Sequence, residues 1–562
     1  MKTIEDFECH FDNFFNKASL TTNNKSLALW RVLTVFEDVA FMVYTNFLKS
    51  NDDEYKYLEE LKTSDFMDKY KFFLKYALSR IEKECTDLSA CSVDPVFNGK
   101  VYKQITKTFK RSELYRMICL HFIATKSGAA EASVKNKKIS IKYKRNHEKH
   151  TILQYTGYVK TEDDNIGRHG LEVVTRLMEN KDPELREKAK SACFMEGIKP
   201  CYIIEWDILR YIYGQVSPSL MKLPDDWNFP WSSLEDFRTF SRALSSLNAY
   251  HIFMNYVATK KFNIRGGGIE NRLLIISKEG LISAIKGLTS LSVEVISRII
   301  TILTYGFGVN NPDPALQPLI PYNDKFILSP FSITTLNFER NALSLHIRTN
   351  KKDFDGRSNA FEKKMTNEFI NRIGERFKFK SPFYLQNSKG GEIDVVLVEE
   401  KSKTIVICEL KWMITPADPN EILNKIKESD HKINQAIRKS VEAQKQIPYI
   451  LERFDINSSS EGWRVYPFSI FDGFPGVESF EGNETVALPQ NIFFMILNSC
   501  CSLGVFCEFI AKGTWLPLEG VHYLNHVNTY TFGGLQFEIQ RVEMLSLTDY
   551  MFSYIPCRIN ED

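Results

Sequence analysis

The sequence has very little net charge, because its 72 lysines and arginines nearly balance its 70 aspartates and glutamates and leave a formal charge of +2. This balance argues against a protein that coats nucleic acid through a uniformly basic surface, and it leaves local patches for such contacts. Low-complexity tracts and internal repeats are also missing. With 43% hydrophobic and 13% aromatic residues, the composition indicates well-packed globular domains rather than a largely disordered chain.

We expect no secretory signal and no membrane span in this sequence, because long uninterrupted apolar runs are missing. The polar, acidic start from Met1 to Asp6 argues against a secretory signal. The strongest hydrophobic stretch near it, Leu27–Leu48, contains Arg31, Glu37 and Asp38, and these charges are costly in a bilayer. We therefore expect an amphipathic core helix there, no membrane association and a cytoplasmic protein.

Motifs of disulfide and hydrolase chemistry are absent as well. The eleven cysteines include no CxxC pair and their number is odd, which reduced thiols explain better than a disulfide framework. Cys500, Cys501 and Cys507 cluster near apolar residues such as Phe493 and Phe506, a setting that favours buried thiols over a zinc site. The chain has no G-x-S-x-G elbow and no HExxH pair, which argues against serine hydrolases and zinc proteases.

The length of 562 residues predicts two to four domains. Apolar residues recur at helical spacing in 27–48, 66–82, 112–124, 233–257 and 292–304. Residues 1–310 are therefore predicted to form a mainly helical region with a role in targeting, sensing or oligomerisation. Four prolines between Asn310 and Asp324 predict a linker, and residues 325–562 are expected to form a second, α/β region.

A basic hairpin is predicted near residues 134–158, inside the helical region. Residues alternate between apolar and polar in Val134–Tyr143 and again in Thr151–Tyr158, and seven of the twenty residues from 131 to 150 are lysine or arginine. Such a ribbon is suited to contacting phosphates. A solvated edge hairpin protected by lysines is an equally good interpretation.

From residue 357 the pattern changes to a helix, three short strands and a further helix. The helix at 358–377 has an apolar face that includes Phe361, Met365 and Phe369, and on a helical wheel Glu362 falls near the middle of that face. A carboxylate aimed into a core costs several kcal/mol unless a positive group meets it. Glu362 is therefore a candidate for a functional site.

The strands are predicted at Phe383–Gln386, Glu392–Val398 and Thr404–Trp412. The last two form a hairpin around Lys401-Ser402, which puts Asp394 directly opposite Glu409. Glu409 and Lys411 are two residues apart on one strand and so share a face. The strands are apolar on both faces, as expected for a sheet that helices cover on both sides.

Facing carboxylates repel each other unless a cation lies between them. Asp394 and Glu409 are therefore expected to hold Mg²⁺ or Mn²⁺, which prefer oxygen ligands, polarise a phosphoryl oxygen and acidify a bound water. Glu362 would support the metal directly or through water, and Lys411 would orient the nucleophile or neutralise charge on a phosphate. The alternative is a charged strand end at a sheet edge, since Glu60-Leu61-Lys62 has the same letters in a helical stretch.

Gly391-Glu392-Ile393-Asp394, Glu409-Leu410-Lys411 and Phe361-Glu362 together resemble the signature of the PD-(D/E)xK phosphodiesterases, the restriction-endonuclease-like superfamily. The resemblance covers roughly residues 355–475. It implies an αβββαβ core, with Ile393 where the name-giving motif has proline.

The resemblance also implies a polar side chain from the following helix, at 421–446, where Gln435 is a better match than Lys432. The implied activity is that of a Mg²⁺-dependent endonuclease acting on DNA, less often RNA, in bacterial restriction, anti-phage defence or repair. Further implied partners are a second copy of the chain or a defence-system protein. The alternative function is a catalytically inactive nuclease fold that binds nucleic acid or a protein. Of the trailing apolar runs, Val465–Phe471 is predicted as a further core strand.

Overall fold

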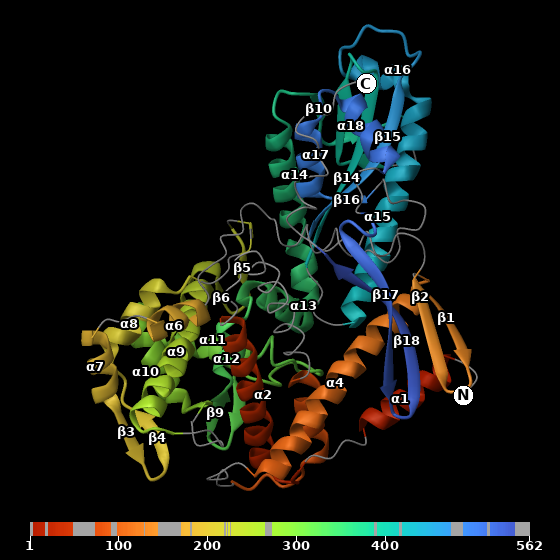
Figure 1. Cartoon of the computed structure of the whole chain (residues 1–562). Coiled ribbons are helices and arrows are strands. Elements are labelled where there is room, and N and C mark those ends of the chain that lie inside the picture. The colour runs from red at the N-terminus through yellow and green to blue at the C-terminus, as the bar shows by residue number, and fades with distance from the viewer. Residues whose placement is uncertain are drawn as a thin grey trace. The chain divides into compact units, whose positions relative to one another are not determined.

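The computed structural model describes residues 4–16, 21–48, 74–90, 98–128, 130–143, 170–179, 183–217, 221, 223–224, 226–264, 272–386, 391–414, 419–473, 487–513 and 518–545. They form a mixed α/β protein (Figure 1). The chain divides into two compact units. Unit 1 comprises Met1–Asp12, Met117–Asp163 and Gly356–Asp562, and unit 2 comprises Asn13–Arg116 and Asp164–Asp355.

Unit 1 contains a five-stranded mixed sheet with the strand order β10-β13-β14-β15-β16. The strands are β10 (Lys378–Lys380), β13 (Val395–Glu399), β14 (Thr404–Met413), β15 (Arg464–Gly473) and β16 (Ala487–Pro489). β13 is antiparallel to both of its neighbours, β10 and β14, whereas β15 lies parallel to β14 and β16 parallel to β15. The parallel step from β14 to β15 is made through α15 (Pro419–Lys445) and α16 (Ile447–Arg453).

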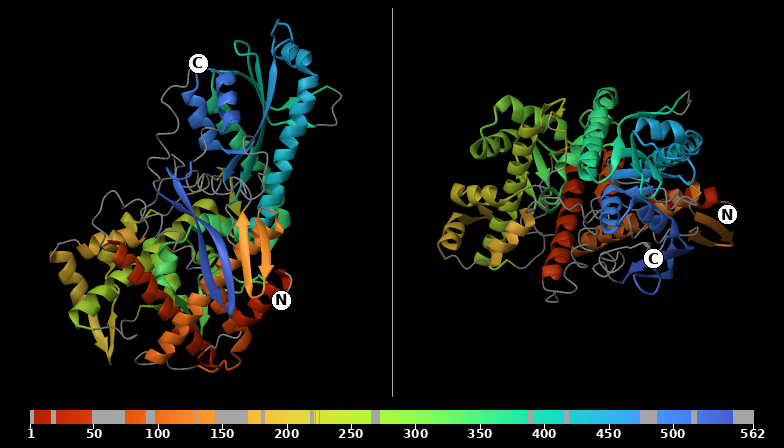
Figure 2. Two further views of the ribbon diagram at one scale, coloured as in Figure 1. Left: turned by 45° about the vertical axis from the view of Figure 1, so that its right-hand side comes forward. Right: turned by 90° about the horizontal axis from the view of Figure 1, so that it is seen from above.

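Helices cover both faces of this sheet, on opposite sides in Figures 1 and 2. On one face lie α14 (Asn359–Ile373), α17 (Gln490–Ser499) and α18 (Leu503–Lys512), which pack on residues such as Leu397 and Cys408. On the other face α15 and α16 pack on alternate positions such as Val396 and Ile407. The period of two along each strand separates the two cores, and it explains why the strands are apolar on both faces.

The β13–β14 hairpin has the predicted register, with Val395 opposite Cys408 and Glu399 opposite Thr404. Its tip is fixed by α18, because the Leu503 amide donates to the Glu399 carboxylate at 2.8 Å. These contacts occupy the amino end of α18, where backbone N–H groups have no partner inside the helix. The turn is thereby tied to the packed core, and the register at the far end of the hairpin follows from it.

The strands around the hairpin differ in detail from the prediction. Phe383–Gln386 is not a strand of the main sheet: β11 (Phe383–Tyr384) pairs with β12 (Glu392–Ile393) in a separate two-stranded sheet. The edge of the main sheet is β10, whose sequence KFK has a single hydrophobic residue and gave no strand signal. The strand predicted at Val465–Phe471 is confirmed as part of β15.

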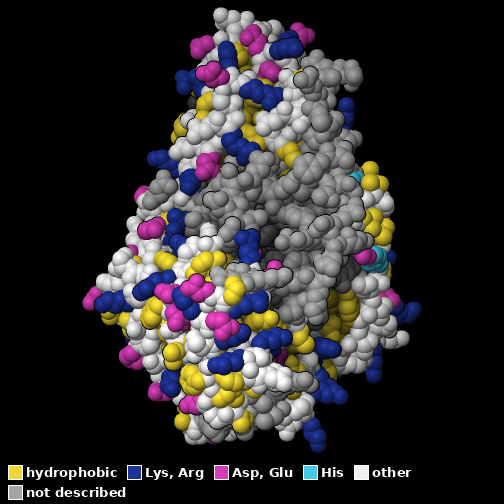
Figure 3. All heavy atoms as spheres, turned by 60° about the vertical axis from the view of Figure 1, so that its left-hand side comes forward, with side chains coloured by type: hydrophobic (Ala, Val, Ile, Leu, Met, Phe, Trp, Pro, Cys, Tyr) yellow, Lys and Arg dark blue, Asp and Glu magenta, His cyan; other side chains and the backbone are white. Residues whose placement is uncertain are grey.

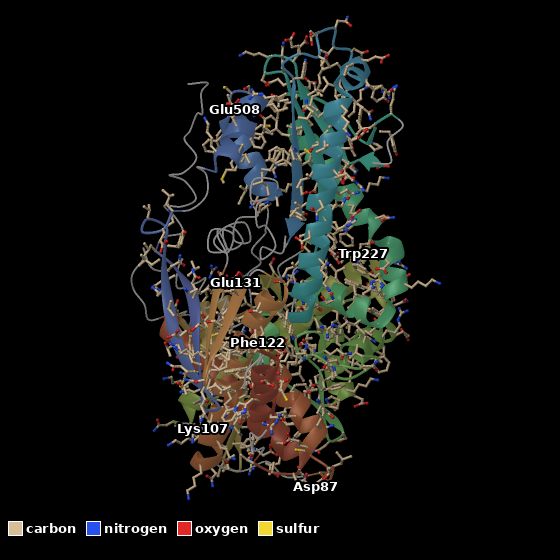
Figure 4. The ribbon with its side chains drawn as sticks, turned by 90° about the vertical axis from the view of Figure 1, so that its right-hand side faces the viewer. Asp87, Lys107, Phe122, Glu131, Trp227 and Glu508 are labelled. Carbon is tan, nitrogen blue, oxygen red and sulfur yellow. The ribbon has the colours of Figure 1, made fainter. Side chains whose placement is uncertain are left out.

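A second sheet of unit 1 has the order β1-β2-β18-β17. Its strands are β1 (Ala130–Lys135), β2 (Lys138–Tyr143), β17 (Tyr523–Phe532) and β18 (Leu535–Met544). Phe7 and Phe11, on α1 (Ile4–Asn16), cover it through Phe537, with ring centroids 6.4 and 5.7 Å apart. Phe11 also meets Phe122 of α4 (Gly99–Lys126) edge-on; Phe122 is labelled in Figure 4.

The basic hairpin of this sheet turns earlier than predicted. Its turn lies at Asn136-Lys137, within the stretch predicted as one strand, because Asn136 adopts a positive φ of 57° that asparagine tolerates better than most residues. Its second strand then pairs in parallel with β18, where Ile139 lies opposite Phe537. Thr151–Tyr158 lies outside the described residues.

Unit 2 is built around the long, largely buried helix α9 (Leu234–Lys261). This helix contacts α6 (Gly170–Glu179), α7 (Pro183–Ala192), α8 (Trp206–Gln215), α10 (Lys278–Leu288), α11 (Val293–Leu303) and α12 (Pro330–Thr334). The unit also contains α2 (Lys25–Leu48), a helix at 74–84, most of α4, and α13 (Phe338–Arg357). Its small sheets are β3 (Cys193–Glu196) with β4 (Lys199–Tyr202), β5 (Asn228–Phe229) with β6 (Ser232–Ser233), and β7 (Leu274–Ile276) with β9 (Lys325–Leu328) and β8 (Ile320–Tyr322).

The proline-rich segment 310–324 is part of the packed structure of unit 2. Gln317 is fully buried, and its side-chain amide donates to the carbonyls of Ile302 and Phe307 while its oxygen accepts from the Gly306 amide. Gln317 thereby satisfies buried backbone groups at the end of α11 and in the turn that follows it, and β8 continues the segment into the three-stranded sheet. Among the helices of the described ranges, none is both long and apolar enough to cross a bilayer.

Glu37 of α2 is a buried acid in unit 2, with 2% of its surface exposed. Ser329 donates a hydrogen bond to it, and the Phe331 amide donates at 3.1 and 3.2 Å. Burial outweighs these donors and the nearby Arg272, and raises the pKa of Glu37 to about 8. The carboxyl is therefore mostly protonated in the folded protein at neutral pH.

We expect the wild-type protein to lose stability relative to Glu37→Gln as the pH rises. The unfolded chain releases this proton near its ordinary pKa of 4.5, whereas the folded chain retains it up to about 8. The loss therefore begins above pH 4.5, is complete near pH 8 and reaches about 5 kcal/mol. Urea unfolding of both proteins across this range measures it, and a pH-independent difference would contradict the raised pKa.

Candidate functional site

The predicted acids Asp394 and Glu409 lie at the end of the β13–β14 pairing. The ladder ends at Val395 and Cys408, so the next facing positions are those of Asp394 and Glu409. The Leu410 amide donates to Asp394 Oδ2 at 2.7 Å, so the Asp394 carboxylate takes the place of a backbone acceptor where the ladder stops. This contact holds Asp394 against the strand that carries Glu409.

Two lysines of α15 meet these acids. Lys432 Nζ lies 3.4 Å from Asp394 Oδ2 and 3.3 Å from Glu409 Oε2, so one ammonium group bridges the two carboxylates. Lys439 Nζ lies 2.5 Å from Glu409 Oε1 and also donates to the Glu392 carbonyl. Both oxygens of Glu409 therefore face a lysine of the same helix.

The helix presents both lysines together because they are seven residues apart, which is close to two turns. Ile433 and Ala436 beside them pack on Met413 and Phe471 of the sheet. This packing turns the lysine-bearing side of α15 toward the end of β14, and Figure 4 shows the helix running alongside the strands.

Glu409 is completely buried and Lys439 nearly so, with side-chain exposures of 0% and 2%. Burial and the neighbouring charge of Asp394 raise the pKa of Glu409, although Lys432 and Lys439 act in the opposite direction. Burial alone lowers the pKa of Lys432, but the carboxylates of Asp394, Glu409 and Glu362 together raise it above its ordinary value. Lys432 therefore stays positively charged between the acids.

Lys411 lies beyond the last pair of the hairpin and reaches the first helix of the domain. Its Nζ donates to Glu362 Oε1 of α14 at 2.6 Å. Beside this ion pair the rings of Phe361 and Trp412 stack, with centroids 4.0 Å apart and an interplanar angle of 17°. The stack fixes α14 against the end of β14, and Trp412 is thereby engaged in packing.

Glu362 does not point into the core as the helical wheel predicted. The buried side of α14 consists of Phe361, Met365, Phe369 and Ile373, whereas 42% of the Glu362 side chain is exposed. A helical wheel predicts the direction in which a side chain points, but it does not predict how deeply that turn of the helix is buried. Glu362 still acts on the cluster, because its charge contributes to the raised pKa of Lys432.

Gln435 lies half-buried on α15 between the turns that carry Lys432 and Lys439. The polar contacts from this helix to Asp394 and Glu409 are made by the two lysines. Lys439 was not predicted from the sequence, because only carboxylates on an apolar helix face were taken to indicate a buried polar site. Its position beside Ala436, Ser440 and Ala443 would have given the same signal as a misplaced acid.

The site brings together three acids and three lysines: Asp394, Glu409 and Glu362, with Lys411, Lys432 and Lys439. Among the described residues, no group of three or more His, Cys, Asp or Glu side chains could hold a metal ion. Asp394 and Glu409 nevertheless each offer an oxygen to one shared cation, the ammonium of Lys432. Mg²⁺ is commonly bound through one or two carboxylates, with water and phosphate as the other ligands, so this pair fits such an ion.

Of the three clustered cysteines, Cys500 and Cys507 are buried as predicted, whereas Cys501 is exposed. Burial raises the pKa of Cys500 to about 12 and also raises the pKa of Cys507, which keeps both thiols protonated and unreactive. On the face drawn in Figure 3, basic side chains are interspersed with acidic ones.

Comparison of the chain with protein-family models, with curated proteins and with solved structures found no match.

Replacing Lys439 with methionine should destabilise unit 1 by roughly 3 kcal/mol or more, because the buried Glu409 loses its closest counter-charge. Replacing Glu409 with leucine at the same time should recover part of this loss, since neither buried charge then lacks a partner. Urea unfolding of both single variants and the double variant gives the coupling energy.

Lys445→Met is the control for this cycle, because Lys445 belongs to an exposed ion pair with Glu442 on the same helix. It should change the free energy of unfolding by less than about 1 kcal/mol. Equal effects of Lys439→Met and Lys445→Met would contradict the assignment of a buried, structurally required pair.

Proposed function

We propose that unit 1 carries a divalent-metal-dependent nuclease that hydrolyses phosphodiester bonds, with DNA rather than RNA as the expected substrate. The observation that supports it best is the sharing of one cation by Asp394 and Glu409, with the amine of Lys411 on the same strand as Glu409. Carboxylates that share a cation at the end of a buried sheet are a donor set suited to a hard divalent ion.

The order of elements in unit 1 supports the same proposal. Helix α14 is followed by the antiparallel strands β10, β13 and β14, then by α15 and by β15 parallel to β14. With the β11–β12 pair and α16 inserted, this order is similar to the αβββαβ order of the PD-(D/E)xK nucleases, whose signature the residues around Asp394 and Glu409 resemble.

Each side chain has a defined part in the proposed reaction. Asp394 and Glu409 would hold Mg²⁺ or Mn²⁺. Glu362, which forms an ion pair with Lys411 in the structure, would support the ion directly or through water. The bound ion would polarise the scissile phosphate and lower the pKa of an attacking water. Lys439 holds one oxygen of Glu409 and leaves the other toward the ion. Lys411 is 27% exposed and can turn from Glu362 to a phosphate oxygen, where its charge stabilises the transition state.

A scaffold that binds nucleic acid or protein without cleaving is the second candidate. One specific observation favours it: three lysines balance the three acids, so the cluster is electrically complete without an ion. Such a cluster is also a stable structural feature. The two candidates differ in whether added metal produces cleavage.

We expect the purified chain to nick or cut plasmid DNA in Mg²⁺ or Mn²⁺ and to be inactive in EDTA. Asp394→Asn should abolish cleavage, because the second carboxylate of the pair is lost. Lys411→Ala should lower the rate at least about a hundredfold, as expected for a group that stabilises transition-state charge. The assay compares plasmid, linear duplex, single strands and RNA.

Lys401→Ala is the matched control, since Lys401 is an exposed lysine in the turn of the same hairpin, and it should retain wild-type activity. Circular dichroism of every variant verifies folding. Metal-independent cleavage, or cleavage activity that persists in Asp394→Asn, would contradict the proposed site. Inertness of the folded wild-type protein on all four polymers would favour the scaffold.

A further inference from the structure

We propose that Lys432 is an exchangeable internal counter-ion, which occupies the Asp394–Glu409 pair in the metal-free protein and leaves it when a divalent cation binds. The inference rests on the metal site of the proposed function and adds that an ammonium group of the chain occupies this site when no metal is bound. It concerns a positioning residue, because Lys432 acts through the two carboxylates.

The two α15 lysines differ in how firmly they are held. Lys439 is 2% exposed and 2.5 Å from Glu409 Oε1, and its second acceptor is a backbone carbonyl that cannot move away. Lys432 is 17% exposed, and its contacts of 3.3 and 3.4 Å to Glu409 and Asp394 are long for charged groups. Lys439 is therefore the fixed partner of Glu409, and Lys432 is the partner that can leave.

The backbone at Lys432 is held by a contact that does not involve its ammonium group. Ser469 of β15, itself fully buried, donates its hydroxyl to the Lys432 carbonyl at 3.1 Å. The helix therefore keeps its position when the ammonium group moves. The four methylenes of the lysine side chain let the ammonium group rotate toward solvent, to which the side chain is already partly exposed.

Displacement preserves the charge of the site. An incoming divalent cation brings the positive charge that the two carboxylates require, so the ammonium can return to water without leaving two acids facing each other. Lys432 thereby stabilises the metal-free protein and competes with the metal. It sets a weaker divalent-ion affinity than the carboxylates alone would give.

The test uses the full-length chain with Mn²⁺ as the probe, measured by isothermal titration calorimetry and by the thermal shift that Mn²⁺ produces. Lys432→Met should bind Mn²⁺ about tenfold more tightly than wild type or better, because a competing charge is gone. In EDTA it should melt below the wild type, and saturating Mn²⁺ should raise its melting temperature by more than that of wild type.

Two further variants separate charge from shape. Lys432→Arg keeps the positive charge and should retain the weak affinity of wild type. Lys425→Met removes a lysine seven residues before Lys432 on the same helix, where it pairs with Glu428 at 2.8 Å, and should leave Mn²⁺ binding unchanged. Lys432→Gln replaces Lys432→Met should the latter fail to fold, as judged by circular dichroism.

The outcomes distinguish this inference from the proposed function. Unchanged or weaker Mn²⁺ binding by a folded Lys432→Met or Lys432→Gln protein overturns the inference, even where wild type cleaves DNA. Absence of Mn²⁺ binding in wild type and variants alike overturns it too. Tighter binding by the variant supports the inference even where no polymer is cleaved, and in that case only the nuclease proposal fails.

Discussion

The arrangement of the site depends on the buried ion pair between Glu409 and Lys439. A carboxylate with no exposed surface is strongly unfavourable unless a cation reaches it, and Lys439 reaches it from α15. The rotation that the packing of Ile433 and Ala436 gives to α15 meets this requirement, because it turns Lys439 toward the end of β14. The same rotation brings Lys432 onto the second oxygen of Glu409 and onto Asp394.

The amino end of β13 is the second feature that forms the site. While β13 and β14 are paired, their polar backbone groups satisfy each other and their side chains are apolar on both faces. Where β13 begins, Asp394 supplies the acceptor that the Leu410 amide would otherwise lack. Beyond that point Lys411 reaches Glu362 of α14. Polar side chains therefore gather where the ladder stops.

The charges of the cluster explain how it can be both stable and reactive. Three acids and three lysines compensate one another, so the folded chain carries no uncompensated buried charge there. The pairs are not equal, however. Glu409 and Lys439 are sealed in the core, whereas Lys411, Lys432 and Glu362 are partly exposed. A fixed pair with movable partners around it keeps the carboxylates in position while allowing a ligand to replace a lysine.

Local sequence signals were sufficient to predict the β13–β14 register, and with it the facing of Asp394 and Glu409, because a hairpin is a local structure whose turn and alternation lie within about twenty residues. They did not determine the depth of Glu362, the edge strand β10, or the parallel pairing of β2 with β18. Lys432 and Lys439 complete the cluster through tertiary packing, which the sequence did not predict. The rotation and docking of α15 depend on packing against strands far along the chain, such as β15, and no local pattern encodes that contact.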